Sequence, residues 1–144
     1  MDGPDEHHQR PPGVDDATVT ALGQLSKARE CCEAARGHLY QFHRLTGNAD
    51  HDLQEAVAML RDAGHAEVAD TLDHELVGRN VLRGRWTFQI VEEYEDDYYA
   101  TFRRLEAEAL DRLADGKRHL AEAEEKEATR THGHPSHTAL PGDE

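Results

Sequence analysis

The densest group of chemically active side chains in this chain lies between Gly78 and Tyr99. This stretch holds the only tryptophan and three of the four tyrosines, together with closely spaced arginines and acids. Guanidinium groups bind carboxylates and phosphates through paired hydrogen bonds, so the block predicts a pocket for a small anionic ligand or an acidic partner. The candidate site residues are Arg79, Arg83, Arg85, Trp86, Glu92, Tyr94, Glu95 and Tyr98.

A structural interpretation of the same block stays open. Arginines near a helix end offset the helix dipole, and they can pair with acids across a turn. The acids in reach are Glu92, Glu93 and Glu95. An ion-pair junction between two helices would therefore show the same residue types as a binding pocket.

Glu95 is expected on the buried side of its helix, between Phe88, Val91, Tyr98 and Phe102. A carboxylate in that position must be paired or protonated, and Arg29 or Arg79 is the expected partner. A buried acid beside tyrosines is also typical of a proton-transfer site. One acid without a second group of known geometry does not predict an enzyme.

The eleven histidines raise the question of a metal site. His51 and Glu55 share one helical face and resemble a fragment of a hemerythrin-type iron site. That face is expected to point away from the core side defined by Leu53, Val57 and Leu60, so these groups cannot converge. Histidines in the terminal segments lack a rigid scaffold. We therefore expect no dedicated metal and no cofactor.

No catalytic signature is present either. The chain lacks the nucleophile-elbow, phosphate-loop and dinucleotide-binding patterns. Glu30 and Glu33 flank Cys31 and Cys32, and neighbouring acids disfavour the reactive thiolate. The sequence thus favours a protein that is not an enzyme.

The charge balance narrows the set of partners. The chain has 16 Lys and Arg against 30 Asp and Glu, a net charge of −14. Nucleic acids and anionic membranes attract basic surfaces, so neither is expected as a partner. No apolar run approaches the length of a membrane span, and the first residues do not form a secretion signal. Two adjacent cysteines fit a reducing cytoplasm.

The elements expected to position these residues are all helical. Apolar residues recur at three- and four-residue steps over about 16–46, 50–80 and 86–127. Asp15 or Asp16 is expected to cap the first helix, and Gly47-Asn48 to end it. Gly64 should kink or break the second helix. The sequence predicts an all-α antiparallel bundle of three long helices over 14–128, with a disordered lead at 1–13 and a disordered histidine-containing tail at 129–144.

Two short motifs between Gly78 and Tyr99 are distinctive. They are Gly-Arg-Asn-Val-Leu at 78–82 and Gly-Arg-Trp-Thr-Phe-Gln at 84–89. With the run at 64–70 they resemble a family of small acidic helical proteins of halophilic archaea, with similar sequences in actinobacteria. The similarity covers roughly residues 50–130. It implies an origin in such organisms and carries no activity, substrate or cofactor. The acidic, lysine-poor composition fits a salt-adapted organism, and high-GC codon bias predicts a similar composition.

Two functions follow as hypotheses. The first is a cytoplasmic, non-enzymatic interaction or structural protein that forms a homodimer, because the predicted third helix outreaches the others and still carries Leu113, Leu120 and Ala123. The second is a binding protein or enzyme for a small anion at Arg79–Tyr99. A cavity lined by Arg85, Trp86 and Glu95 would favour the second hypothesis, and a flat ion-pair lattice would favour the first.

Overall fold

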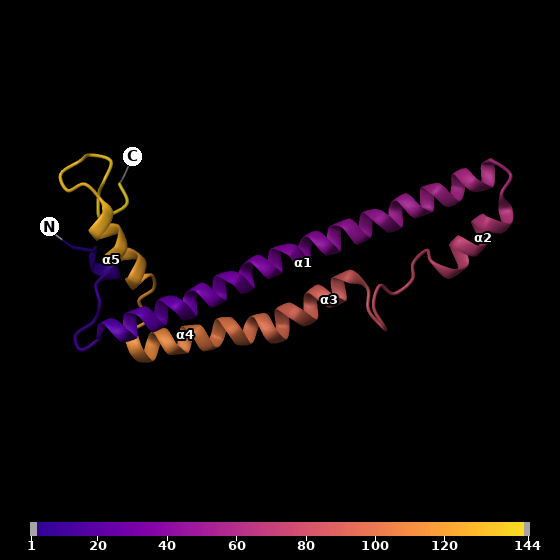
Figure 1. Cartoon of the computed structure of the whole chain (residues 1–144). Coiled ribbons are helices and arrows are strands. Elements are labelled where there is room, and N and C mark those ends of the chain that lie inside the picture. Colours follow the sequence, from indigo (N-terminus) through magenta and orange to yellow (C-terminus); the bar gives the residue numbers. More distant parts are fainter. Residues whose placement is uncertain (1–2, 143–144) are drawn as a thin grey trace. The chain divides into compact units, whose positions relative to one another are not determined.

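The computed structural model describes residues 3–142, and its regular secondary structure is helical (Figure 1). The described residues form no strand, and their one β-bridge, between Leu82 and Arg85, closes a short turn. The all-α prediction is confirmed. The elements in chain order are η1 (Glu6–His8), α1 (Asp16–Asp62), α2 (Ala66–Glu75), α3 (Thr87–Tyr94), the π-helical segment η2 (Glu95–Tyr99), α4 (Ala100–Ala114) and α5 (Leu120–Thr129).

Helix α1 begins as expected, with the Asp15 carboxylate accepting from the Thr18 N–H at 2.8 Å. Its predicted end at Gly47-Asn48 is wrong, because the helix continues to Asp62. An interior glycine costs only about 1 kcal/mol relative to alanine, and Leu53 and Val57 keep one face of α1 packed beyond it.

The break expected near Gly64 ends α1 instead of dividing a middle helix. Gly64 adopts a left-handed φ of 90°, which only glycine reaches without strain. The His65 N–H then donates to the Leu60 carbonyl at 2.8 Å, and the Gly64 N–H donates to the Arg61 carbonyl at 3.0 Å. These two bonds form a Schellman motif, which satisfies carbonyls that the helix end leaves free.

The predicted third helix over 86–127 is also wrong in its extent. Helix α3, η2 and α4 follow one another without a break, but the helix stops at Ala114. Asp115 and Gly116 then take positive φ values of 51° and 74°, and α5 starts after this turn. The apolar pattern runs on into α5, so periodicity alone could not reveal the turn. A bundle of three antiparallel helices is not confirmed.

The chain forms two compact units, and we describe each by itself. Unit 1 comprises Met1–Cys32 and Ala100–Glu144, of which residues 3–32 and 100–142 are described. Its side chains close a hydrophobic core between α1, α4 and α5. The core consists of Val19, Leu22, Leu110, Ala114 and Leu120, with Val14, Ala109 and Ala121 packed against it.

Polar contacts join the rest of unit 1 to this core. Arg29 of α1 pairs with the buried Glu106 of α4 at 2.8 Å. Arg10 pairs with Glu124 of α5, also at 2.8 Å. The predicted disorder of 1–13 and 129–144 stays a prediction, and residues 1–2 and 143–144 lie outside the described range.

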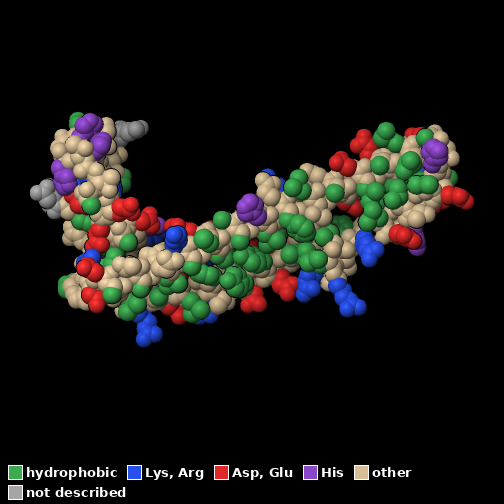
Figure 2. Space-filling view, viewed as in Figure 1, with side chains coloured by type: hydrophobic (Ala, Val, Ile, Leu, Met, Phe, Trp, Pro, Cys, Tyr) green, Lys and Arg blue, Asp and Glu red, His purple; other side chains and the backbone are tan. Residues whose placement is uncertain are grey.

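Unit 2 comprises Glu33–Tyr99 and is built differently. Its buried side chains are spread along the elements and form no cluster like that of unit 1. Eleven large apolar side chains of unit 2 are exposed: Tyr40, Phe42, Leu45, Met59, Val68, Leu76, Val81, Leu82, Trp86, Phe88 and Tyr98. In the space-filling view, hydrophobic side chains gather over α2 and α3 (Figure 2).

Within residues 3–142, none of the helices combines the length and the hydrophobicity needed to cross a membrane.

Candidate functional site

The structure separates the candidate residues at 79–98 into three local arrangements, all within unit 2. Glu95 joins a polar network with α1. Arg85 forms an exposed ion pair with Glu93. Arg79 and Trp86 line a pocket with residues of α1.

The Glu95 network anchors η2 on α1. The Arg36 guanidinium donates to the Glu95 carboxylate at 2.8 Å, and the Tyr40 hydroxyl donates to the same oxygen. The Arg36 guanidinium also lies over the aromatic rings of Tyr40 and Tyr99, at 5.3 and 4.6 Å from their centroids. Glu95 is therefore ion-paired as expected. Its side chain is 28% exposed, and its partner is Arg36 instead of Arg29 or Arg79.

These contacts decide the protonation of Glu95. The hydrogen bond from Tyr40, followed by that from Arg36, lowers the pKa of the Glu95 carboxyl below its ordinary value. The same contact raises the pKa of the Tyr40 hydroxyl. Glu95 is thus a firmly ionised acceptor at neutral pH, whereas a general acid or base needs a pKa near the working pH. The network supports anchoring and not proton transfer.

The π-helical segment explains why regular α-helical spacing predicted the wrong tyrosine on the buried side of the helix. A π turn holds one more residue than an α turn, which rotates the following side chains around the helix axis. Tyr98, expected on the buried side, is 59% exposed and lies 5.9 Å from the Tyr94 ring. Tyr99 takes the inner position at 8% exposure and donates to Glu33 at 2.9 Å.

Arg36 and Tyr40, the partners of Glu95, are not among the site residues predicted from the sequence. They lie four residues apart on α1, on one face of the helix. An arginine and a tyrosine at this spacing, facing the predicted position of Glu95, were the available signal.

The remaining charged residues of the block lie at the surface. Arg85 pairs with Glu93, with one of its nitrogens 3.2 Å from the carboxylate, and both side chains are exposed. Exposed pairs of this kind stabilise a fold by no more than about 1 kcal/mol. Arg83 and Glu92 are also exposed. This part of the block corresponds to the structural interpretation.

Arg79 and Trp86 belong to an open pocket of about 220 Å³. Helix α1 supplies Thr46, Gly47, Asp50, His51 and Gln54 to its lining. The segment before α3 supplies Arg79, Val81 and Trp86, and Thr87 is the first residue of α3. The pocket includes Trp86 but not Arg85 or Glu95, so it is not the cavity lined by all three residues that would favour the second hypothesis.

Hydrogen bonds hold the pocket wall in place. The Gly78 N–H donates to the Asp50 carboxylate at 3.0 Å, and the Trp86 indole N–H donates to the Gly78 carbonyl at 3.2 Å. Gly78 has a left-handed φ of 72°, which its lack of a Cβ permits. His43 contacts the Thr87 hydroxyl at 2.7 Å. Both Gly78 and Thr87 are thus hydrogen-bonded to side chains of α1.

Helix α1 carries a second feature in unit 2, an apolar stripe that faces solvent. Its positions are separated by three and four residues in turn, and all are exposed, with Leu45 at 64% and Met59 at 65%. We call this set the outer stripe: Phe42, Leu45, Ala49, Asp52, Ala56 and Met59.

The outer stripe lies next to the face of α1 that unit 2 itself covers. Each covered position follows an outer-stripe position by one residue, which is a rotation of about 100° around the helix. The covered positions are His43, Thr46, Asp50, Leu53, Val57 and Leu60, all at least partly buried. Helix α1 therefore presents two neighbouring faces at heptad spacing, and only one of them is covered.

Side chains that could bind a metal ion come together in unit 1, outside the Arg79–Tyr99 block. Among the described residues, Glu30, His119 and Glu122 form a group of three such side chains close enough to hold one ion. His51 and Glu55 are exposed and belong to no such group.

Comparison of the chain with protein-family models, with curated proteins and with solved structures finds no match.

Proposed function

We propose that this protein is a non-enzymatic helical interaction protein whose partner is a second copy of the same chain. The observation that carries the proposal is the outer stripe of α1, a second apolar face at heptad spacing that the chain itself leaves uncovered. One apolar face is enough to fold a helix onto its own domain. A neighbouring face with the same spacing is typical of a helix that packs against a further helix.

The distribution of side-chain sizes along the outer stripe favours self-pairing. In a two-fold antiparallel arrangement centred between Ala49 and Asp52, Leu45 faces Ala56 of the second copy. Phe42 then faces Met59. Large residues thus meet small or flexible ones, which lets the two helices interdigitate. A two-fold axis uses the same patch on both copies, so one stripe is sufficient.

The length of the stripe suits a specific contact. From Phe42 to Met59 the helix rises about 26 Å, which is close to five helical turns. The other exposed apolar side chains of unit 2 add to the surface that an assembly would remove from water. The net charge of −14 opposes the approach of two copies, and salt screens that repulsion.

Sedimentation velocity of the full chain in molar KCl tests the proposal. The wild type should sediment as a dimer, and Leu45→Lys combined with Met59→Lys should sediment as a monomer with unchanged helix content. Ala58→Lys is the matched control, because Ala58 is exposed on the far side of α1. It should remain a dimer. A monomeric wild type at high protein concentration would reject self-pairing.

A cytoplasmic location is part of the same proposal. Cys31 is exposed and Cys32 is buried, and the two are not joined in a disulfide. Cysteines that stay reduced are typical of a reducing compartment.

The pocket beside Trp86 supports a second candidate, the binding of a small anion. Arg79 and His51 contribute cationic or hydrogen-bonding groups to its lining, and Trp86 contributes an aromatic surface. Asp50 also lines the pocket, but its oxygens already accept from the Gly78 N–H and the Gln54 amide. A carboxylate or phosphate would pair with Arg79 in this arrangement.

Calorimetric titration with inorganic phosphate tests the second candidate. Arg79→Gln should abolish the heat of binding, and Arg83→Gln, which removes the same charge outside the lining, should retain it. Equal binding by the two variants would mean that any attraction is a general effect of surface charge.

A further inference from the structure

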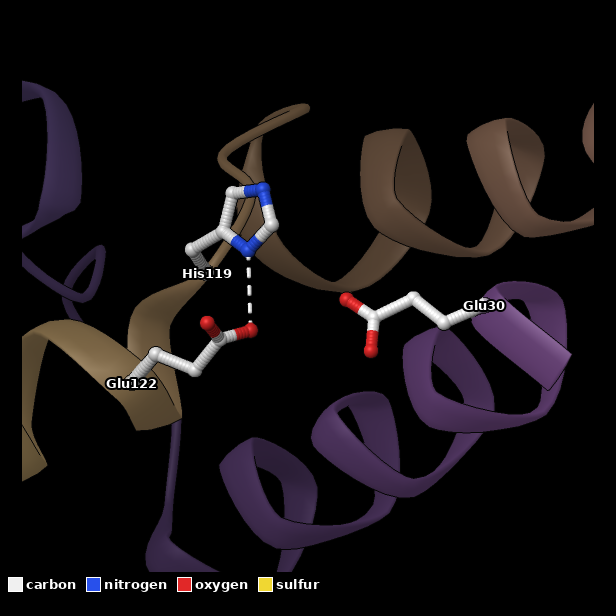
Figure 3. A group of neighbouring side chains, drawn as sticks. All are labelled: Glu30, His119 and Glu122. Atoms are coloured by element: carbon white, nitrogen blue, oxygen red, sulfur yellow. Dashed lines mark hydrogen bonds and ion pairs between the residues drawn. The ribbon is translucent and has the colours of Figure 1, made fainter. Parts of the chain in front are cut away.

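The most distinctive unassigned group in unit 1 is formed by Glu30, His119 and Glu122 (Figure 3). Glu30 projects from α1, His119 directly precedes α5, and Glu122 lies in the first turn of α5. The His119 Nδ1 atom is 2.9 Å from a Glu122 carboxylate oxygen. One donor atom from each of the three side chains lies within 4.8 Å of the other two.

Two features of the backbone bring these side chains together. Gly23 of α1 allows α5 to approach closely, since a Cβ at this position would lie only 3.2 Å from the Ala121 Cβ. Glu30 follows Gly23 by two helical turns on the same face of α1. His119 has a left-handed φ of 59°, an uncommon conformation for a residue other than glycine. The close contact and the turn place the imidazole and Glu122 opposite Glu30.

The two carboxylates of the group favour a bound cation. Within residues 3–142, no lysine or arginine forms an ion pair or hydrogen bond with Glu30 or Glu122. The nearby Lys117 donates instead to the backbone carbonyls of Glu6 and Gln9, at 3.2 and 2.9 Å. Two carboxylates that face each other without a guanidinium or ammonium group repel one another, and a bound cation would remove that repulsion.

We propose that Glu30, His119 and Glu122 bind a divalent transition-metal ion, with Zn²⁺ as the best fit. An imidazole nitrogen and two carboxylate oxygens are donors that Zn²⁺ accepts at about 2.0–2.2 Å. Two ligand atoms of a tetrahedral Zn²⁺ lie about 3.4 Å apart, which is slightly longer than the 2.9 Å between His119 Nδ1 and Glu122 and lies inside the 4.8 Å within which all three donor atoms fall. Small rotations of the exposed side chains therefore complete the site.

The histidine separates this group from an ordinary acidic patch. Calcium and magnesium prefer oxygen ligands alone, whereas an imidazole nitrogen favours zinc and its transition-metal neighbours. All three side chains are exposed, so water would fill the remaining coordination position. The bound ion would link α1 to α5 within unit 1 and stabilise that unit by binding only the folded state.

The full chain is titrated with Zn²⁺, and binding is measured by calorimetry. Thermal unfolding is the second readout. The terminal histidines could bind metal on their own. The parent for all measurements is therefore a variant with asparagine at these positions: His7, His8, His132, His134 and His137. We expect one Zn²⁺ per chain and a Zn²⁺-dependent rise in the unfolding temperature.

Three ligand variants and two matched controls decide the outcome. Glu30→Gln, Glu122→Gln and His119→Asn should each weaken Zn²⁺ binding by at least about tenfold and remove the thermal shift. Asparagine is chosen at His119 because it tolerates a left-handed φ. Glu125→Gln on α5 and His38→Asn on α1, both exposed, should bind like the parent. Binding within twofold of the parent by all three ligand variants would overturn the site.

Discussion

Units 1 and 2 use similar helical sequences to reach stability in opposite ways. Unit 1 surrounds a small cluster of leucine, valine and alanine side chains with three helices, and its charged pairs lie at the edge of that core. Unit 2 has no such cluster, and it relies on the Arg36–Glu95–Tyr40 network and on hydrogen bonds around Gly78. Most of its large apolar side chains remain in contact with solvent.

The difference indicates which unit is complete. Burial of apolar area is the main favourable term in folding, and unit 1 obtains it within its own chain. In unit 2 the apolar side chains of the outer stripe stay exposed, so a partner could bury them. We infer that unit 1 is the stable half of the fold and that unit 2 is the half adapted for association.

The largest expected effect is a loss of the unit 1 core. Leu110→Ala should lower the free energy of unfolding by about 3 kcal/mol, because Leu110 is 6% exposed and its removal leaves a cavity. Leu105→Ala, at a half-exposed position on the same helix, should cost about 0.5 kcal/mol. Urea unfolding measures both variants. Equal losses would mean that unit 1 has no closed core.

A smaller effect is expected for Glu95→Gln in unit 2. Because the folded protein lowers the pKa of Glu95, this carboxylate stabilises the fold at neutral pH. That contribution is fully present above the ordinary glutamate pKa of about 4.3 and is lost as the pH falls through the lowered value. The variant should melt below the wild type at pH 7.

The pH dependence supplies the control for this variant. The difference in melting temperature between Glu95→Gln and the wild type should shrink as the pH falls below about 4. Glu92→Gln, at an exposed position, should melt like the wild type at every pH. A difference for Glu95→Gln that did not change with pH would show that lost packing, and not lost charge, explains the effect.

The next effect concerns Asp52, the one charged residue of the outer stripe. In the proposed self-paired arrangement, Asp52 of each copy faces Ala49 of the other, close to the two-fold axis. Asp52→Leu should therefore tighten the dimer, since it removes two like charges and adds apolar area. Sedimentation equilibrium measures the change in dissociation constant. A weaker dimer would mean that the stripe is not the interface.

The smallest effect is expected from salt on the melting temperature of the dimer-deficient Leu45→Lys, Met59→Lys variant. Screening of the net negative charge should raise its melting temperature by a few degrees between low and molar KCl. A flat or falling trend would contradict the proposed salt adaptation.

The fold was predictable where the local signal was strong. The helical content, the Asp15 cap and the break at Gly64 followed from periodicity, from the cap residue and from the conformational freedom of glycine. The continuation of α1 through Gly47 and Asn48 was not predictable, because an interior glycine and a terminating glycine look alike until the packing on both sides is known. The turn at Asp115-Gly116 was not predictable either, because the apolar pattern continues across it.

Within the Arg79–Tyr99 block, the pairing of Glu95 could be predicted from the sequence, and its partners could not. The π-helical segment also rotated Tyr98 outward and brought Tyr99 inward. Arg36 and Tyr40 are about sixty residues away in the chain, so only the fold could identify them as the partners of Glu95. The convergence of Glu30 with His119 depends on the turn before α5 and was invisible for the same reason.

The placement of Trp86 and of all four tyrosines in unit 2 has an optical consequence. Unit 1 contains neither residue type, so ultraviolet fluorescence and near-ultraviolet circular dichroism report almost entirely on unit 2. Far-ultraviolet circular dichroism reports on the helices of both units. The wild-type chain can therefore be followed by two signals in one heating experiment without any label. Coincident curves would show that the two units unfold together, and an earlier change in the aromatic signal would show that unit 2 opens first.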